Sequence, residues 1–152
     1  SKTLLIPMGF EKVDLMEPLP HMLDQAKKEV PAEKAGEFML ASMQEAKLAE
    51  NTYDVILIQW AAIYLTDDDF VKFLKNCFAA LRPGGIVFFK ENCTGENTTD
   101  LLVDNDDSSL TRSDAHYKII FEKAGVKLLK EEYQKSWPKD LFPVKMYALG
   151  GK

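Results

Sequence analysis

A strand pattern, a helix pattern and a second strand pattern follow one another between residues 53 and 90, and this order constrains the fold most. Residues 53–58 form a nearly continuous apolar run, as expected for a central parallel strand covered on both faces. Thr66 and the three aspartates after it can begin a helix with one apolar stripe that reaches Leu81. The Arg-Pro-Gly-Gly turn at 82–85 then leads into a strand at 86–90.

The same alternation extends to both sides of this segment. Residues 13–17 predict a short strand that ends at an acid, and Pro18 and Pro20 open a helix that closes near Pro31. A short strand is possible at 38–41. After a long polar loop at 91–112, we expect a helix from Ser113 to Ala124 and two closing strands at 126–133 and 144–149. Alternating strands and helices predict an α/β fold with a mostly parallel sheet, as a single domain over residues 1–152.

Charge and composition exclude several classes of protein. The net charge of −5 comes without a run of lysine and arginine, which argues against a nucleic-acid surface. Mild acidity is ordinary for soluble proteins, although it would also suit a cationic substrate. The longest apolar run, at 55–65, contains Gln59 and is well short of the roughly 20 residues that span a bilayer. We therefore expect neither a nucleic-acid nor a membrane partner.

Two cysteines and two histidines limit the metal and disulfide chemistry. Cys77 and Cys93 make no disulfide framework, and with His21 and His116 they give no zinc spacing. No signal-peptide pattern opens the sequence. We expect no metal and an intracellular location, cytoplasmic or nuclear.

The acid at the end of the first predicted strand is a candidate ligand-binding residue. Ligands of doubly wound folds lie beyond the carboxyl ends of strands, where the carboxylate of Glu17 could accept hydrogen bonds from a ribose diol. It could equally be a charge at the start of the following helix. A glycine-rich loop normally lies about 20 residues before such an acid, and that count runs off the start of the sequence near Ser1. The sequence is either no nucleotide-binding domain or begins just after the loop, and then residues 4–6 would end the helix that follows the loop.

Three segments carry a resemblance to a known family. They are the strand and turn Tyr53-Asp54-Val55-Ile56-Leu57-Ile58-Gln59-Trp60 with Leu65-Thr66-Asp67, the turn Leu81-Arg82-Pro83-Gly84-Gly85-Ile86, and the loop Lys90-Glu91-Asn92 with Asp104-Asn105-Asp106-Asp107-Ser108-Ser109. They resemble the protein α-N-terminal methyltransferases, which are class I S-adenosylmethionine-dependent methyltransferases. The similarity covers essentially all 152 residues. It implies a Rossmann-like sheet, mostly parallel with a terminal antiparallel strand, that lacks the first strand and the glycine-rich loop.

The resemblance also implies roles for individual residues. Glu17, Met43, Gln44 and Gln59 would bind S-adenosylmethionine at the ribose, the adenine and the methionine end. Trp60, Tyr64 and Asp104 would border the substrate, which in this family is a protein N-terminus beginning X-Pro-Lys or X-Pro-Arg. Asn92 would bind the backbone of the substrate, and Asp107 would face its amine. From the residues alone, Met43 and Gln44 are an ordinary loop, Trp60 is more often a core residue, and Asp107 belongs to a solvated charge run.

One position departs from the family pattern, and two other functions stay open. Many members have histidine where this sequence has Tyr64, so the proton path from the amine differs, and His116 does not replace that histidine on sequence grounds. A methyltransferase of small molecules would share Glu17 and the Arg-Pro-Gly-Gly turn but not Trp60 or the Asp-Ser-Ser loop. A non-catalytic methyltransferase-like binding module is the second alternative.

Overall fold

The structure of the chain is a computed structural model that describes residues 5–95 and 101–151. It contains two compact units, residues 1–47 and residues 48–152, and each is described by itself. The assignment of residues 1–152 to a single domain stays a prediction. Among the described residues, no helix has the length and apolar character needed to cross a bilayer.

The first unit is a parallel strand pair with one helix. Strands β1 (Val13–Glu17) and β2 (Ala35–Leu40) pair in parallel, and α1 (Pro20–Glu29) connects them. Proline fits the first turn of α1 because that turn needs no intrahelical N–H donor. The strand and the helix agree with the prediction. The predicted helix end at residues 4–6 is wrong for Leu5 and Ile6, which lie in a turn, and Leu4 lies outside the described residues.

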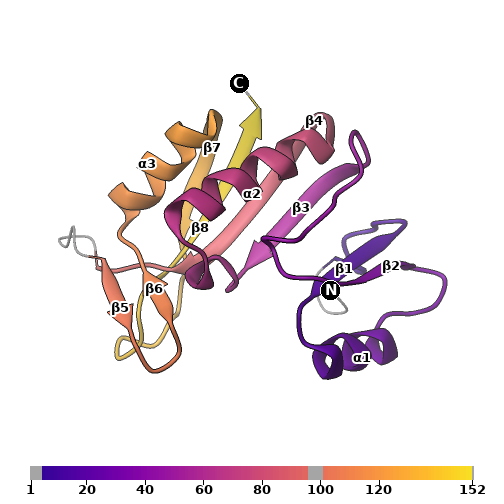
Figure 1. Cartoon of the computed structure of the whole chain (residues 1–152), viewed down its shortest axis with the longest axis horizontal. Coiled ribbons are helices and arrows are strands. Elements are labelled where there is room, and N and C mark those ends of the chain that lie inside the picture. The colour runs from indigo at the N-terminus through magenta and orange to yellow at the C-terminus, as the bar shows by residue number, and fades with distance from the viewer. Residues whose placement is uncertain (1–4, 96–100, 152) are drawn as a thin grey trace. The chain divides into compact units, whose positions relative to one another are not determined.

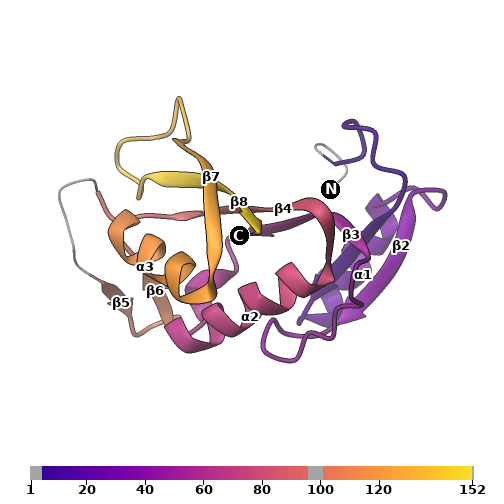
Figure 2. The same cartoon turned by 90° about the horizontal axis from the view of Figure 1, so that it is seen from above.

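The second unit is built on a four-stranded sheet with the order β3-β4-β8-β7. Strands β3 (Tyr53–Gln59) and β4 (Leu81–Asn92) are parallel, whereas β8 (Val144–Gly151) runs antiparallel to both β4 and β7 (Val126–Tyr133). The helices α2 (Asp67–Ala80) and α3 (Asp114–Ala124) cover one face of this sheet (Figures 1 and 2). The α/β fold with one antiparallel strand near the C-terminus is confirmed.

Strand β3 differs from its prediction. In the described part of the chain it pairs with β4 and forms an edge of the sheet. Most of its side chains are half-buried, and Ile58 alone among them is fully buried. Within these residues the strand therefore lies at an edge and not at the centre as expected, because an apolar run is common to half-buried and fully buried strands and does not give the number of neighbouring strands.

The ends of the two large helices follow local rules that the sequence shows. The hydroxyl oxygen of Thr66 accepts a hydrogen bond from the backbone N–H of Asp69 at 3.2 Å, and Ser113 does the same for His116 at 3.2 Å. Gly125 ends α3 with a φ of 72°, a left-handed conformation that glycine adopts without strain. These caps fix where α3 begins after the long loop.

That loop is more ordered than predicted. Within residues 91–112, strands β5 (Leu102–Asp104) and β6 (Ser109–Thr111) form a short antiparallel hairpin. Residues 96–100 lie outside the described part. A short 3-10 helix, η1 (Ala62–Tyr64), follows β3. The hairpin, η1 and the end of β4 provide most of the lining of the candidate site.

Candidate functional site

The carboxyl ends of β3 and β4 lie side by side. The parallel register pairs Gln59 with Lys90, and the exposed side chain of Gln59 stands at the end of β3. The next residue, Trp60, has a φ of 47°, which is uncommon for a bulky side chain. Its backbone N–H donates to the carbonyl of Lys90 at 3.1 Å. The chain therefore leaves the sheet in a defined, strained turn at the point where ligands bind in such folds.

Trp60 lies partly at the surface and is not a core residue. Its side chain is 38% exposed. The indole N–H donates to Oδ1 of Asn92 at 3.1 Å, the ring centre lies 6.2 Å from that of Trp137, and Nζ of Lys90 lies 5.0 Å from the ring centre. The ring is thus oriented by Asn92, Trp137 and Lys90 while one part of it stays open to solvent.

Asn92 is held at three points. Its backbone N–H donates to Oε1 of Glu91 at 2.9 Å, and its carbonyl accepts from the hydroxyl of Tyr117 at 2.9 Å. The third contact is the hydrogen bond from Trp60. Because Oδ1 accepts from the indole, the amide NH₂ of Asn92 is the group that can donate to a ligand.

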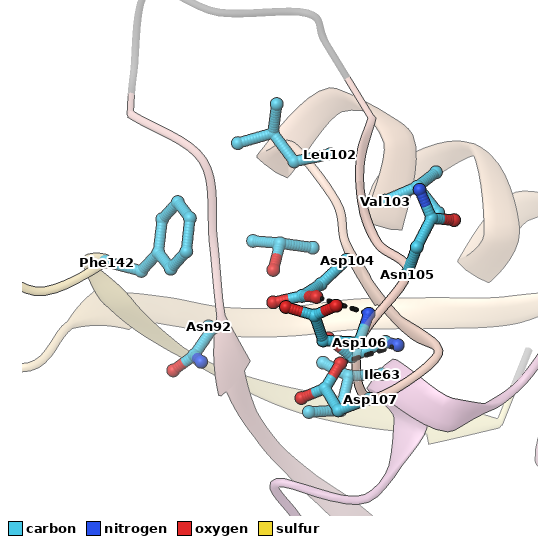
Figure 3. A pocket seen from close by; sticks show the side chains of 11 residues that line it. Ile63, Asn92, Leu102, Val103, Asp104, Asn105, Asp106, Asp107 and Phe142 are labelled. Carbon is cyan, nitrogen blue, oxygen red and sulfur yellow. Dashed lines mark hydrogen bonds between the residues drawn. The ribbon is translucent and has the colours of Figure 1, made fainter.

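A pocket of about 540 Å³ lies between the end of β4, η1, the β5–β6 hairpin and the loop before β8. Figure 3 shows the aspartates gathered on the hairpin, with Asn92 and Phe142 on the opposite side. Three carboxylates line the pocket, and none of the described lining residues is a lysine or arginine. The lining residues are Ile63, Asn92, Leu102, Val103, Asp104, Asn105, Asp106, Asp107, Ser109, Thr111 and Phe142.

The aspartates also shape the turn of the hairpin. Oδ1 of Asp104 accepts from the backbone N–H of Asp106, and Oδ1 of Asp107 accepts from that of Ser109, each at 2.9 Å. Between them Ser108 has a φ of 60°, a left-handed conformation that such side-chain bonds help to maintain. The pocket therefore offers fixed negative charge to a cationic ligand.

An ion pair between the buried Arg112 and the partly exposed Asp67 lies next to the residues that line the pocket. The fully buried Arg112 donates to Oδ1 of Asp67 at 2.8 Å and to the carbonyls of Ala62 and Leu65 at 3.2 and 2.6 Å. Burial would raise the pKa of Asp67, but hydrogen bonds from His116 and Arg112 outweigh it and hold that pKa below its usual value. Arg112 thus ties η1 and the start of α2 to the segment that follows the hairpin.

The structure separates Tyr64 and His116 from the pocket. Tyr64 ends η1 with its side chain 56% exposed, and it is not among the lining residues. The Nε2 atom of His116 contacts Oδ2 of Asp67 at 2.6 Å, so this histidine belongs to the ion pair of Arg112 and Asp67. Of the predicted residues, Asn92, Asp104 and Asp107 line the pocket, and Trp60 contacts it through Asn92.

The other predicted ligand residues lie in the first unit. Glu17 ends β1, and its Oε1 accepts from the backbone N–H of Leu19 at 3.0 Å. This contact at the start of α1 is the alternative that the sequence allowed. Met43 is half-buried and Gln44 exposed in a turn after β2, where the carboxylate of Glu45 accepts from the hydroxyl of Ser42 at 2.8 Å. Their roles stay predictions.

Sequence reasoning assigned no role to most of the residues around the site. Ile63 and Phe142 line the pocket, the ring of Trp137 is tilted against that of Trp60, and Glu91 and Arg112 are buried and do not line it. One signal was available, because alternation along residues 86–92 places Glu91 on the same face as apolar residues.

Comparisons with known proteins agree with one another. Residues 1–150 match a family described as AdoMet dependent proline di-methyltransferase. The alpha N-terminal protein methyltransferase 1 of Dictyostelium discoideum is 39% identical over 100% of this chain and 56% of its own length. The N-terminal Xaa-Pro-Lys N-methyltransferase 1 of Xenopus tropicalis is 35% identical over 98% of this chain and 66% of its own length.

A solved structure shows the same architecture. A SAM-dependent methyltransferase of Leishmania major is 55% identical and superposes with a TM-score of 0.90, over 97% of this chain and 58% of the other. This chain therefore spans between about half and two thirds of the length of the relatives it matches.

Proposed function

Because the chain belongs to the family of AdoMet dependent proline di-methyltransferases, we propose that its protein transfers methyl groups to the α-amino group of protein N-termini. The substrates would begin X-Pro-Lys or X-Pro-Arg, and the donor would be S-adenosylmethionine. The observation that carries this proposal is the pocket that Asp104, Asp106 and Asp107 line together with Asn92. Such a peptide has a cationic amine, a backbone carbonyl and a cationic third side chain, which match these groups.

The residues expected to hold S-adenosylmethionine fit its parts. Oε1 of Glu17 accepts from Leu19, and a carboxylate has further acceptor sites for a ribose diol. The half-buried Met43 and its neighbour Gln44 can border an adenine, and the exposed amide of Gln59 stands at the end of β3. When bound, the cofactor supplies a methyl group on positively charged sulfur.

The residues of the pocket would prepare the amine for attack. An α-amino group has a pKa near 8, so a carboxylate can bind the ammonium and accept its proton directly or through a water molecule. We assign this role to the second carboxylate oxygen of Asp107, because the first is bonded to Ser109. Asn92 would donate to the first carbonyl of the peptide, and Trp60 would form the wall of the peptide channel. Most of the acceleration would come from this positioning.

The position of Tyr64 supports a proton path that does not use it. The side chain is exposed and does not line the pocket.

Asp104 lies on the same hairpin as Asp107 and would bind the cationic third residue of the substrate. A cytoplasmic or nuclear location also belongs to the proposal, and the two free, buried thiols of Cys77 and Cys93 support it.

The experiment that tests the function compares three peptides with isotope-labelled S-adenosylmethionine. The first begins Ser-Pro-Lys, the second is the same peptide with an acetylated N-terminus, and the third replaces Lys with Glu. We expect label on the α-nitrogen of the first peptide alone, located by tandem mass spectrometry. Label on the lysine side chain, or equal labelling of the acetylated peptide, would contradict the proposal. Transfer to a small molecule instead would support the alternative methyltransferase.

A further inference from the structure

The carboxylate of Glu91 lies on the face of β4 that packs against the helices. Val87, Phe89 and Glu91 alternate along this face, and each is 0% exposed. Burial raises the pKa of Glu91 to about 7. An apolar residue of similar size at such a position is often as stable as a buried charge, or more stable. Packing alone therefore does not account for the acid.

The contacts of Glu91 connect two segments that line the pocket. Its Oε1 accepts from the backbone N–H of Asn92 at 2.9 Å. The backbone N–H groups of Ala61, Ala62 and Ile63, where η1 begins, lie near enough to lower its pKa against the effect of burial. Within the described part of the chain, Oε2 makes no hydrogen bond of standard geometry. Among the described residues, the hydrogen bond of standard geometry that the carboxylate accepts is therefore the one from Asn92.

Asn92 and Ile63 both line the pocket, whereas Glu91 does not. The side chain of Asn92 projects to the opposite face of β4, where its Oδ1 accepts from the indole of Trp60. Its carbonyl accepts from the hydroxyl of Tyr117, a fully buried residue of α3. A change at Glu91 would therefore reach the substrate through the backbone of Asn92.

We propose that Glu91 is a positioning residue of this site. From the opposite face of β4, its carboxylate fixes the backbone of Asn92, so that the amide of Asn92 is oriented for the substrate. The part that concerns substrate rests on the proposed function, but the part that concerns geometry does not.

The geometric part can be tested without any assay of activity. The chain contains two tryptophans, so its proton–nitrogen NMR spectrum has two indole signals, which Trp60→Phe and Trp137→Phe variants assign. The Trp60 indole reports the hydrogen bond to Asn92, and the Trp137 indole donates to the carbonyl of Phe142 at 2.9 Å as an internal control. At pH 8, Glu91→Gln should shift the Trp60 signal and make its proton exchange about tenfold faster. The Trp137 signal should stay in place.

Two results would overturn the proposal. If neither indole signal changes in Glu91→Gln, the carboxylate does not control Asn92. If both signals change together and the melting temperature falls, Glu91 acts on the whole unit and not on the site. That second result is the one expected if Glu91 only stabilises the fold. Under the proposal, Glu91→Gln removes a buried charge, and the melting temperature at pH 8 should not fall.

Two further variants, Glu91→Asp and Tyr117→Phe, keep the proposal testable if Glu91→Gln does not fold. Glu91→Asp keeps the charge on a shorter side chain, so the Trp60 signal should lie closer to that of the unaltered protein than it does in Glu91→Gln. Tyr117→Phe removes the hydroxyl that holds the carbonyl of Asn92 and should move the same signal. If Glu91→Asp were more disturbed than Glu91→Gln, side-chain length and not charge would be decisive, and the proposal would fail.

The catalytic consequence is measured separately. Glu91→Gln should raise the KM for a Ser-Pro-Lys peptide about tenfold and leave the affinity for S-adenosylhomocysteine unchanged by calorimetry. If a version extended at the N-terminus methylates no such peptide but the indole signal moves as expected, the proposed function fails and the positioning role stands. If the peptide is methylated equally well by both proteins, the positioning role fails and the function stands.

Discussion

The indole N–H of Trp60 and Oδ1 of Asn92 lie 3.1 Å apart and join the ends of two neighbouring parallel strands. The bond leaves the amide NH₂ of Asn92 as the donor toward the pocket. Without the bond, the amide could rotate and present its oxygen instead. The tryptophan therefore has a role in orienting a polar neighbour in addition to forming a wall.

From this geometry we expect Trp60→Phe to weaken peptide binding. The ring is largely kept, but the hydrogen bond, with a typical net contribution of about 0.5–1.5 kcal/mol, is lost, so the KM for the peptide should rise roughly two- to tenfold. Steady-state kinetics would measure it. Lys90→Met is the matched control, because it removes the cation 5.0 Å from the ring centre and keeps the bond to Asn92. An equal rise in both variants would show that the ring environment matters and the hydrogen bond does not.

The pair formed by Arg112 and Asp67 should be important for stability. Arg112 is fully buried, and its replacement by methionine leaves the carbonyls of Ala62 and Leu65 without this donor, whereas Asp67 keeps its contact with His116. We expect Arg112→Met to lower the free energy of unfolding by about 1–3 kcal/mol, as measured by urea denaturation.

The exposed pair of Arg82 and Asp54 provides the control for that experiment. The two side chains are 54% and 66% exposed and lie 2.9 Å apart. Solvent screens such a pair, so Arg82→Met should cost less than about 1 kcal/mol. Similar losses in the two variants would mean that burial of Arg112 adds nothing.

The raised pKa of Glu91 predicts a pH dependence of stability. The pKa is about 7 in the folded chain and has a usual value of 4.5, so the folded state binds more protons than the unfolded state between these values. Its contribution to stability is complete below pH 4.5 and is lost as the pH rises through about 7. The loss should be on the order of 3 kcal/mol. Denaturant unfolding would measure the free energy of unfolding of the chain and of Glu91→Gln at pH 4.5 and at pH 8. Between these two values, the chain should lose more of this free energy than the variant does. Parallel curves would contradict the raised pKa.

Local patterns in the sequence predicted most elements, and contacts between distant residues account for what they missed. The caps at Thr66 and Ser113 and the glycine at 125 are local signals: α2 begins after Thr66, and α3 begins after Ser113 and ends before Gly125. The neighbours of β3 depend on pairing across the sheet, which an apolar run does not encode. The hairpin at residues 102–111 was missed because its strands are three residues each, which is too short for a pattern of alternation to be recognised.

In the candidate site too, some residues could be predicted from the sequence, and others depend on contacts between distant residues. Asn92, Asp104 and Asp107 were assigned through the family resemblance, and the structure brings them to one pocket. The role proposed for Glu91 could not be derived from its residue type and its position in the sequence. Its burial follows from alternation along β4, but its contacts with Asn92 and the start of η1 depend on how β3, η1 and β4 come together.

The cofactor prediction concerns the length of the chain. Glu17, Met43, Gln44 and Gln59 would contact only part of S-adenosylmethionine, and the glycine-rich loop of class I methyltransferases lies before the segment that this chain resembles. We expect the 152-residue chain to bind S-adenosylmethionine far more weakly than a version extended at the N-terminus. Isothermal titration calorimetry would compare the two proteins, and equal affinities would show that the shorter chain holds a complete site.

Asp107 provides the most direct test of the proposed chemistry. We expect Asp107→Asn to lower methylation of a Ser-Pro-Lys peptide by about 10²–10⁴-fold, the range typical of general-base and orienting roles. Asparagine keeps an oxygen for the backbone N–H of Ser109, so the turn should stay intact while the charge is lost. Affinity for S-adenosylmethionine should be nearly unchanged. Because the variant lacks a proton acceptor, raising the pH should partly restore the rate by supplying neutral amine.

Asp106→Asn is the matched control for this prediction, since Asp106 lies in the same turn and lines the same pocket. It lowers the negative charge by the same amount, so a general electrostatic effect would reduce the rate equally in both variants. A role specific to Asp107 requires a much larger loss in Asp107→Asn and a rescue at high pH that Asp106→Asn does not show. Unchanged turnover of Asp107→Asn at neutral pH would return Asp107 to the solvated charge run that the sequence also allows.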